Sequence, residues 1–260
     1  MLALLAAWLA WDAYECGVPA VVAVRSAVRD LDPALALRLV QLSDVHDASF
    51  LGGDEPLWAA IRGFRPDAIM LSGDYVDGAT TDLARPLARA ATLMTLAPRV
   101  FYVPGNHDHW SGRLSELSAG LAARGVTVLR NRSTPWDVRG ARLYVVGIDD
   151  AYTHHDDVAR AAAGVPAAAC AIALTHDPTV VDRLGDAPVD FVLAGHTHGG
   201  QVRVPFVGAV WAPGQGLFPR YDRGCYDLPG GRRMYVDSGL GTSIMPVRAF
   251  DRAQISLLSL

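Results

Sequence analysis

The stretch Gly195-His196-Thr197-His198-Gly199-Gly200 decides how the rest of this sequence is interpreted. It directly follows Asp190-Phe191-Val192-Leu193-Ala194, an apolar run typical of a short buried strand. An α/β sheet presents its ligand-binding side chains at the carboxyl ends of its strands. We therefore expect the two histidines on a tight turn at such an edge, where the glycines let the backbone approach a ligand closely.

The same pattern recurs upstream, because several apolar runs end in carboxylate, amide or imidazole side chains. The runs predict strands at 20–24, 35–42, 68–72, 100–103, 126–129, 141–148, 169–174 and 254–260. Helices are predicted at 56–64, 83–96, 114–124 and 158–163. This alternation favours an α/β layer fold whose loops gather at one edge. The side chains at the strand ends are Asp44, His46, Asp74, Asn106, His176, His196 and His198.

These seven side chains offer nitrogen and oxygen atoms to a metal. The three cysteines, Cys16, Cys170 and Cys225, lie far apart in the sequence and indicate neither a disulfide framework nor a thiolate site. Carboxylate, amide and imidazole ligands suit manganese, iron or zinc. Seven ligands are too many for one open catalytic ion and fit two ions that share a carboxylate. The alternative is a noncatalytic α/β domain with capped turns.

Five blocks of the sequence, taken in order, resemble the motifs of the calcineurin-like metallophosphoesterases. They are Asp44-Val45-His46, Gly73-Asp74-Tyr75-Val76-Asp77, Gly105-Asn106-His107-Asp108, His176 and Gly195-His196-Thr197-His198. The resemblance extends over residues from about 35 to 260. It implies an α/β (α+β) fold, a four-layer αββα sandwich in which helices flank two mixed β-sheets, with a dinuclear metal site at the strand ends.

The resemblance also implies roles for individual residues. One ion would be held by Asp44, His46 and His198, the second by Asn106, His176 and His196, with Asp74 bridging the two. His107 corresponds to the general acid of the family, and Asp108 is expected to orient it. The two ions would be divalent, most readily Mn²⁺, with Fe or Zn as alternatives.

The implied activity is metal-dependent hydrolysis of a phosphodiester or pyrophosphate bond by a hydroxide that bridges the two ions. Two departures argue against phosphoprotein substrates: Gly78-Ala79 replaces the usual Arg-Gly after Asp77, and Asp108 replaces a glutamate. An inactive scaffold with the same fold is the alternative class. The complete ligand set favours the enzyme.

Three further stretches resemble a membrane-associated bacterial branch with phosphodiesterase-like members and UDP-2,3-diacylglucosamine pyrophosphatases of lipid A biosynthesis. They are 195–201, 215–221 and 238–243, the last followed by Pro246-Val247-Arg248. We expect a small-molecule or lipid phosphoester as substrate, with a general or cyclic-nucleotide phosphodiesterase as the alternative. The net charge of -4 argues against nucleic acid. Arginines and aromatics can bind phosphate and acyl groups. The candidates are Arg220, Arg223, Trp211 and Phe218, unless this segment is a hairpin with packed aromatics and solvated arginines.

The N-terminal segment, residues 1–30, is expected to be separate from a catalytic domain at 31–260. Its apolar run ends at Asp12, well short of the roughly 20 residues that span a bilayer. Trp8 and Trp11 suit an interfacial helix, so we expect peripheral membrane contact through residues 1–15. The alternatives are a helix packed on a soluble cytoplasmic domain and the remainder of a longer span. Unpaired cysteines favour the cytoplasmic side of a membrane.

Overall fold

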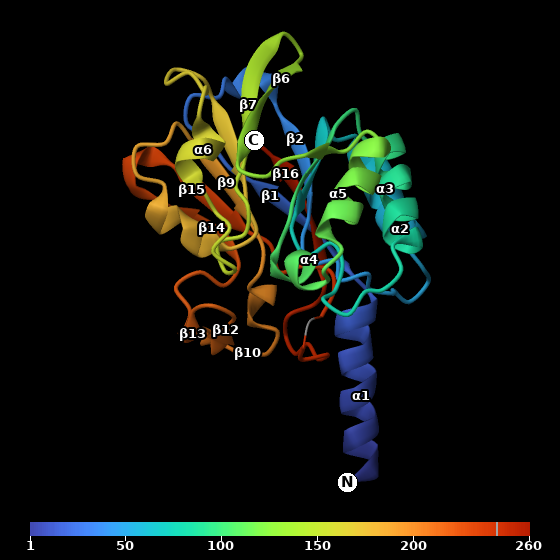
Figure 1. Cartoon of the computed structure of the whole chain (residues 1–260). Helices are drawn as coiled ribbons and strands as arrows, with labels where there is room; N and C mark the ends of the chain where they lie inside the picture. The colour runs from blue at the N-terminus through green and yellow to red at the C-terminus, as the bar shows by residue number, and fades with distance from the viewer. Residues whose placement is uncertain (243) are drawn as a thin grey trace.

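Two six-stranded sheets pack face to face in the computed structural model, which describes residues 1–242 and 244–260 (Figure 1). Ser243, at the end of the stretch 238–243, lies outside the described residues. In spatial order, the first sheet contains β1 (Ala20–Arg25), β16 (Gln254–Ser259), β2 (Arg38–Leu42), β3 (Ala68–Ser72), β4 (Val100–Val103) and β5 (Thr127–Val128). The second contains β14 (Gly224–Asp227), β15 (Arg233–Val236), β9 (Phe191–Ala194), β8 (Ala171–Leu174), β7 (Ala141–Gly147) and β6 (Arg132–Val138).

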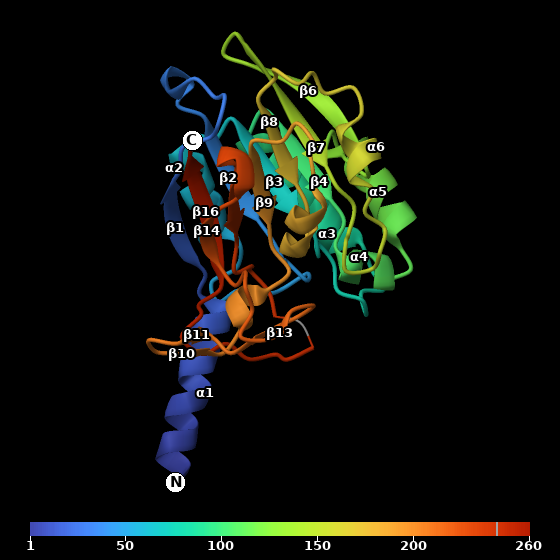
Figure 2. The ribbon, with the colours of Figure 1, turned by 90° about the vertical axis from the view of Figure 1, so that its left-hand side faces the viewer.

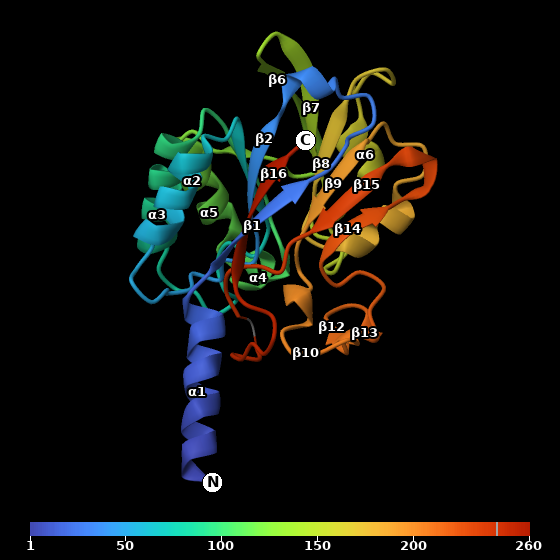
Figure 3. The same ribbon diagram turned by 180° about the vertical axis from the view of Figure 1, so that it is seen from behind.

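Helices cover the outer faces of the sandwich (Figure 3). The first sheet is covered by α2 (Glu55–Phe64), α3 (Ala84–Leu96) and α5 (Leu114–Ala123), which bury Ile61, Leu93 and Leu117 against it. The cover of the second sheet is thinner and consists of α6 (Val158–Ala162) and the 3-10 helix η2 (Pro178–Arg183). The remaining helices are α1 (Leu2–Gly17), α4 (Asn106–Trp110), η1 (Pro33–Leu35), η3 (His198–Gly200) and η4 (Pro229–Gly231).

The predicted four-layer arrangement with two mixed sheets is confirmed. Strands β2, β3, β4 and β5 run parallel, as do β7, β8, β9 and β15. Antiparallel pairs, β16 with β2, β6 with β7 and β14 with β15, make both sheets mixed. The inner faces of the sheets share one core, in which the Phe101 ring meets Trp136 edge-on. Because the parallel strands end at the same edge, their C-terminal loops from both sheets meet there.

Some element boundaries differ from the sequence prediction. The strand expected at 35–42 begins at Arg38, because Asp32 caps the preceding turn η1. The strand expected at 126–129 is shorter, and β6 was not predicted at all. Pro135 lies within β6, at the outer edge of the second sheet, where a missing N–H group costs no ladder bond.

Helix α1 is longer than the apolar run and projects from the body at the end where the loops of the site lie (Figure 2). Residues 3–11 are all exposed, so this part of α1 is not packed on the domain as the alternative interpretation required. No helix within 1–242 and 244–260 has both the length and the hydrophobicity needed to cross a bilayer. At the same end of the body as α1 lie two short hairpins, β10 (Arg203–Val204) with β11 (Gly208–Ala209) and β12 (Trp211–Ala212) with β13 (Gly216–Leu217).

Candidate metal centre

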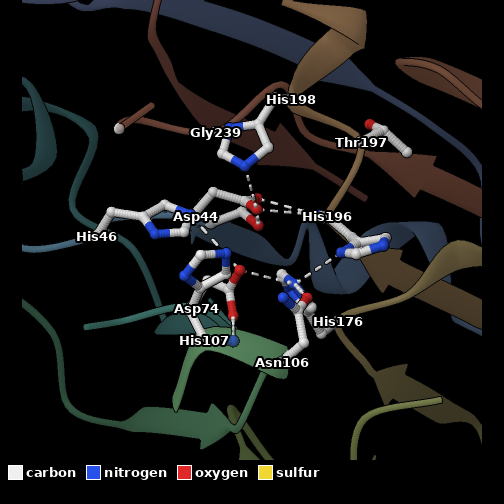
Figure 4. A network of polar contacts seen from close by, with 12 residues as sticks. Asp44, His46, Asp74, Asn106, His107, His176, His196, Thr197, His198 and Gly239 are labelled. Atoms are coloured by element: carbon white, nitrogen blue, oxygen red, sulfur yellow. Dashed lines mark hydrogen bonds and ion pairs between the residues drawn. The ribbon is translucent and has the colours of Figure 1, made fainter. Parts of the chain in front are cut away.

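The seven side chains predicted as metal ligands converge at one edge of the sandwich (Figure 4). They follow β2, β3 and β4 in the first sheet and β8 and β9 in the second. Each is at most 7% exposed: Asp44, His46, Asp74, Asn106, His176, His196 and His198. The structure therefore brings together residues that are up to 154 positions apart in the sequence, from Asp44 to His198.

The surroundings of His176 test whether a cation fits this site. Its Nδ1 lies 2.9 Å from the carbonyl oxygen of Ser72, which can only accept, so Nδ1 carries the proton. Its Nε2 faces Asn106 Oδ1, His196 Nδ1 and Asp74 Oδ2, each at 3.2 Å. One proton on Nε2 satisfies one of these neighbours, whereas a metal ion satisfies all of them. The nitrogen and oxygen atoms fit a divalent metal here.

A second group of ligand atoms lies on the other side of Asp44 (Figure 4). Oδ1 of Asp44 is 3.4 Å from Nε2 of His198, whose ring stacks on His46 with centroids 5.1 Å apart. The ligand atoms of these three residues all lie within 4.8 Å of one another. Nε2 of His46, which lies 3.5 Å from Oδ2 of Asp74, is buried and has no hydrogen-bond partner among the described residues. Buried ligand atoms of this kind, without partners of their own, suit a second cation.

Asp74 lies between the two groups. Its Oδ1 accepts a hydrogen bond from the backbone N–H of His107 at 2.8 Å. Its Oδ2 is 3.5 Å from Nε2 of His46 and 3.2 Å from Nε2 of His176. Burial raises the pKa of this carboxyl, but the imidazoles of His176 and His46 outweigh it and hold the pKa well below its usual range. Asp74 is thus an ionised carboxylate with one oxygen shared between the two groups.

Two glycines allow the close approach of these loops. A Cβ on Gly195 would lie 1.6 Å from the Ser43 hydroxyl and 2.6 Å from Asp44 Oδ2. Gly73 has a φ of +85°, and a Cβ there would lie 2.5 Å from Nδ1 of His176. Both positions therefore require glycine on steric grounds. The prediction that glycines beside the histidine pair let the backbone approach the site is confirmed at Gly195.

His107, the expected general acid, lies beside the group formed by His46 and His198. Its ring centroid is 4.6 Å from that of His46. The backbone N–H of Gly78 donates to Nδ1 at 3.2 Å, which places the proton of a neutral ring on Nε2. Burial lowers the pKa of His107. The ligand atoms of His107, His46 and Asp74 also lie within 4.8 Å of one another.

The contacts of Asp108 differ from the expectation that it orients the His107 ring. Its Oδ1 and Oδ2 accept from the backbone N–H groups of Val76 and Gly105, at 3.0 and 2.9 Å. Asp108 therefore joins the loops after β3 and β4, and burial raises its pKa to about 6. The carboxylate beside the His107 ring belongs to Asp77, whose Oδ2 is 3.3 Å from Nδ1 of both His46 and His107.

Asp77 is a site residue to which the sequence prediction gave no role. It lies three positions after Asp74, in the same strand-end loop that indicated the ligands, so the same signal could have found it. The polar contact with the His46 imidazole lowers its pKa to about 2. Asp77 is thus an ionised carboxylate held between two imidazoles.

A pocket of about 180 Å³ opens over the site. Of the four residues predicted to bind substrate, Trp211 alone lines it in the part of the chain that the structure describes. Arg223 instead pairs with the buried Asp251 at 2.6 Å, Arg220 pairs with Asp182 at 3.1 Å, and Phe218 is 70% exposed. Trp110, which adjoins the expected acid in sequence, also lines the pocket. The sequence prediction gave no role to the other lining residues, Tyr152, Gln201, Pro213, Ile244 and Met245.

Comparisons with known proteins agree with this geometry. The profile of the calcineurin-like phosphoesterase family matches residues 37–200. The chain is 33% identical over 233 residues to phosphodiesterase YaeI of Escherichia coli, covering 86% of this chain and 77% of that protein. It is 27% identical to a bovine (Bos taurus) transmembrane protein with metallophosphoesterase domain, covering 93% of this chain and 57% of that longer protein. A phosphopantetheinyl hydrolase structure from Mycobacterium tuberculosis shares the fold, with a TM-score of 0.52, 13% identity and coverage of 79% and 91% of the two chains. The chain therefore belongs to the calcineurin-like phosphoesterase family and is a phosphoester hydrolase.

Proposed function

We propose that this protein hydrolyses a phosphodiester or pyrophosphate bond with two divalent metal ions. Asp44, His46 and His198 would hold one ion, and Asn106, His176 and His196 the other, with Asp74 shared. The observation that carries the proposal is the set of three ligand atoms 3.2 Å from Nε2 of His176, repeated as a second cluster around Asp44. The name of the relative YaeI, a phosphodiesterase, supports the bond type.

When bound, the two ions supply Lewis-acid chemistry, which activates water and neutralises the phosphoryl oxygens. The residues of the chain orient that chemistry. Ser72 fixes the tautomer of His176, and the N–H group of His107 fixes one oxygen of Asp74. His107 would hold a proton at Nε2 for the leaving oxygen, both in the neutral ring, whose Nδ1 accepts from Gly78, and in the charged ring, whose Nδ1 carries a second proton beside Asp77. Asp77, beside Nδ1, stabilises the charged form of that ring.

Metal counting tests the shared carboxylate. In Asp74→Ala we expect loss of bound metal and of bis(p-nitrophenyl) phosphate hydrolysis, because both clusters lose a ligand atom. Asp186→Ala, at an exposed aspartate outside the site, is the matched control and should retain both. Two tightly bound ions in Asp74→Ala, counted by elemental analysis, would contradict the shared role. We propose Mn²⁺ as the most effective ion, and activity restored with Mn²⁺, Fe²⁺ and Zn²⁺ in turn tests this.

The leaving group separates an acid from a ligand at position 107. His107→Ala should keep two ions and lose roughly 10²-fold or more in turnover, the usual contribution of a positioned acid. The loss should be larger for a phenyl than for a p-nitrophenyl leaving group, because p-nitrophenolate departs without protonation. His154→Ala, at an exposed histidine, is the control. Loss of metal in His107→Ala would instead make His107 a ligand.

For the substrate, we propose a small-molecule phosphoester, lipid-linked and of the UDP-2,3-diacylglucosamine type, handled by residues 31–260. The apolar pocket wall, with Trp110, Trp211 and Ile244, supports an acyl-bearing substrate over a cyclic nucleotide. In this proposal residues 1–15 contact a membrane and the domain lies on its cytoplasmic face, which the unpaired cysteines favour. Strand β1, at residues 20–25, pairs with β16 and so joins the proposed N-terminal segment, residues 1–30, to the first sheet.

A substrate panel tests this choice. UDP-diacylglucosamine, glycerophosphodiesters, cyclic nucleotides and bis(p-nitrophenyl) phosphate should be compared under the same metal conditions. We expect the highest kcat/KM for the acylated substrate. Hydrolysis confined to water-soluble diesters would reject a lipid-linked substrate and leave the general phosphodiesterase.

A further inference from the structure

Four strongly exposed apolar side chains lie at the end of the body that holds the metal pocket, and one of them, Ile244, lines that pocket. The exposed fraction is 109% for Phe206, 85% for Ile244, 69% for Leu217 and 70% for Phe218. These four residues are called the rim. They lie on three loops, with Leu217 and Phe218 on the same hairpin, on the side of the body from which α1 projects (Figure 2). Apolar tips of this kind on a soluble surface mark an interaction site.

We infer that the rim, together with α1, binds the surface of a phospholipid bilayer, so that the pocket opens at the level of the lipid headgroups. This rests on the proposed function for the chemistry in the pocket and adds where the substrate is presented. The partner is the bilayer itself, and the substrate is a phosphoester that enters the pocket from the headgroup layer.

The exposure of α1 favours a bilayer over a protein partner. Residues 3–11 contain no polar side chain and are exposed around the whole circumference of the helix, over more than two turns. A protein groove covers one face of a helix, whereas lipid surrounds it. A helix that is apolar on every side is stable where every side is buried in an apolar medium.

The charges at the base of α1 complement a headgroup layer. Arg252 stacks on the Tyr14 ring at 4.6 Å and donates to backbone carbonyls, with no carboxylate partner among the described residues. The nearby acidic groups point into the body instead. Glu15 accepts from the N–H of Asp251, and Asp12 from that of Arg248, both at 2.8 Å. The Arg252 guanidinium and the Tyr14 ring therefore lie at the level where the phosphates of the lipid headgroups would be.

The same contacts fix the orientation of α1 to the pocket. Besides the bonds of Asp12 and Glu15, the carbonyl of Gly17 accepts from Leu51 at 2.7 Å, so the last turns of α1 are tied to the body on several sides. The Trp11 ring lies 6.1 Å from that of Phe250, an exposed residue of the same face. Insertion of residues 3–11 therefore brings the rim down onto the bilayer rather than leaving the body free on a tether.

Fluorescent labelling tests the position of the rim in the full chain. Of the three thiols, that of Cys225 is the exposed one, so it is first removed by Cys225→Ser. Three variants are then made in this background, each with one new cysteine: Phe206→Cys, Leu5→Cys or Ala168→Cys. Each new cysteine is labelled with the environment-sensitive dye NBD. Ala168 is the control, because it lies before β8, at the opposite end of that strand from His176. With phosphatidylcholine–phosphatidylglycerol vesicles, we expect a blue shift and quenching by nitroxide lipids at positions 206 and 5 and neither at 168.

A shift at position 5 alone would overturn the inference, because the pocket would then face water. Absence of a shift at both positions would overturn it as well. The double variant Phe206→Asp/Leu217→Asp should partition onto vesicles at least about tenfold more weakly than the Ala168→Asp control, since two apolar contacts with lipid are lost. Hydrolysis of bis(p-nitrophenyl) phosphate without vesicles should be unchanged in all variants. If that activity is absent even from the wild type, the proposed function fails, while the labels still decide the docking.

Discussion

Replacement of the buried Arg248 by methionine should lower the stability of the metal-site loops more than replacement of an exposed arginine does. The Arg248 side chain is fully buried and joins the loop at 238–241 to the segment before β16, while its backbone N–H donates to Asp12 of α1. One guanidinium nitrogen donates to the carbonyls of Ser238, Gly239 and Gly241, at 2.8, 3.1 and 2.7 Å. The other donates to the Asp251 carbonyl at 3.0 Å and lies 3.4 Å from its carboxylate.

The magnitude follows from the groups that lose a partner. Methionine fills part of the space but leaves the buried carbonyls of Ser238 and Gly241 unsatisfied, each at about 1 kcal/mol, the low end of the usual cost. The Gly239 carbonyl still accepts from the N–H of Gln254 at 3.0 Å. The weakened contact to Asp251 adds about 1–2 kcal/mol, limited because Arg223 still pairs with that carboxylate at 2.6 Å. The free energy of unfolding should therefore fall by about 3–4 kcal/mol, and Tm by roughly 6–16 °C at about 2–4 °C per kcal/mol for a chain of this size.

The loss should also reach the metal centre. The loop at 238–241 packs on Asp44, since the N–H of Leu240 donates to the Ser43 carbonyl at 3.0 Å and that of Gly241 to the Asp44 carbonyl at 2.6 Å. We expect weaker binding of metal by Arg248→Met, measured by titration below the unfolding transition, alongside urea denaturation. Arg220→Met, at an exposed arginine, should stay within about 1 kcal/mol of the wild type. An Arg248→Met protein with equal stability and metal affinity would refute this reasoning.

Three other perturbations have definite expected outcomes. Asp77→Asn should lower kcat for p-nitrophenyl diesters by about 10–100-fold, because two imidazoles lose the carboxylate 3.3 Å away, with Asp186→Asn as control. Removal of metal with a chelator should lower Tm, since ligand binding to the folded state stabilises it by about 3 kcal/mol at a hundred times Kd. Burial raises the pKa of Asp237 to about 7. Between roughly pH 4 and 7 the folded state therefore holds a proton on this carboxyl that the unfolded state has released. The free energy of unfolding should fall as the pH rises through this range. Asp237→Asn should flatten that slope in urea denaturation measured at pH 5, 6 and 7.

The sequence was sufficient to predict the strands that carry the metal ligands, for a physical reason. β3, β4, β8 and β9 are buried on both faces, so they appear as continuous apolar runs, and each ends where polar side chains begin. Parallel strands then place those side chains at one edge without further information. The order of the blocks added the division into two ions, which spacing alone leaves open.

The residues that the sequence could not assign act through contacts between distant segments. The backbone N–H of Arg248 donates to Asp12, 236 positions away, and nothing in the local sequence indicates that the guanidinium of Arg248 is buried. Arg220 and Arg223 suggested phosphate binding, but each has a carboxylate partner that becomes visible only in the fold. The charge of an arginine is a property of the sequence, whereas its availability to a substrate depends on the neighbours that folding brings to it.

The backbone of the ligands explains why aspartate and histidine occur at these turns. Five of the seven predicted ligands have positive φ: Asp44, His46, Asp74, His196 and His198, at values from 47° to 70°. Such conformations cost of order 1 kcal/mol or more for a side chain with a Cβ, and aspartate and histidine tolerate them better than most residues. The strain turns consecutive side chains toward a common centre, so that His196 serves one cluster while His198, two residues later, serves the other. Such backbone strain persists only where surrounding contacts stabilise it. Here the backbone N–H groups of His196 and His107 donate to Asp44 and Asp74. These hydrogen bonds hold the two clusters in shape before any ion binds.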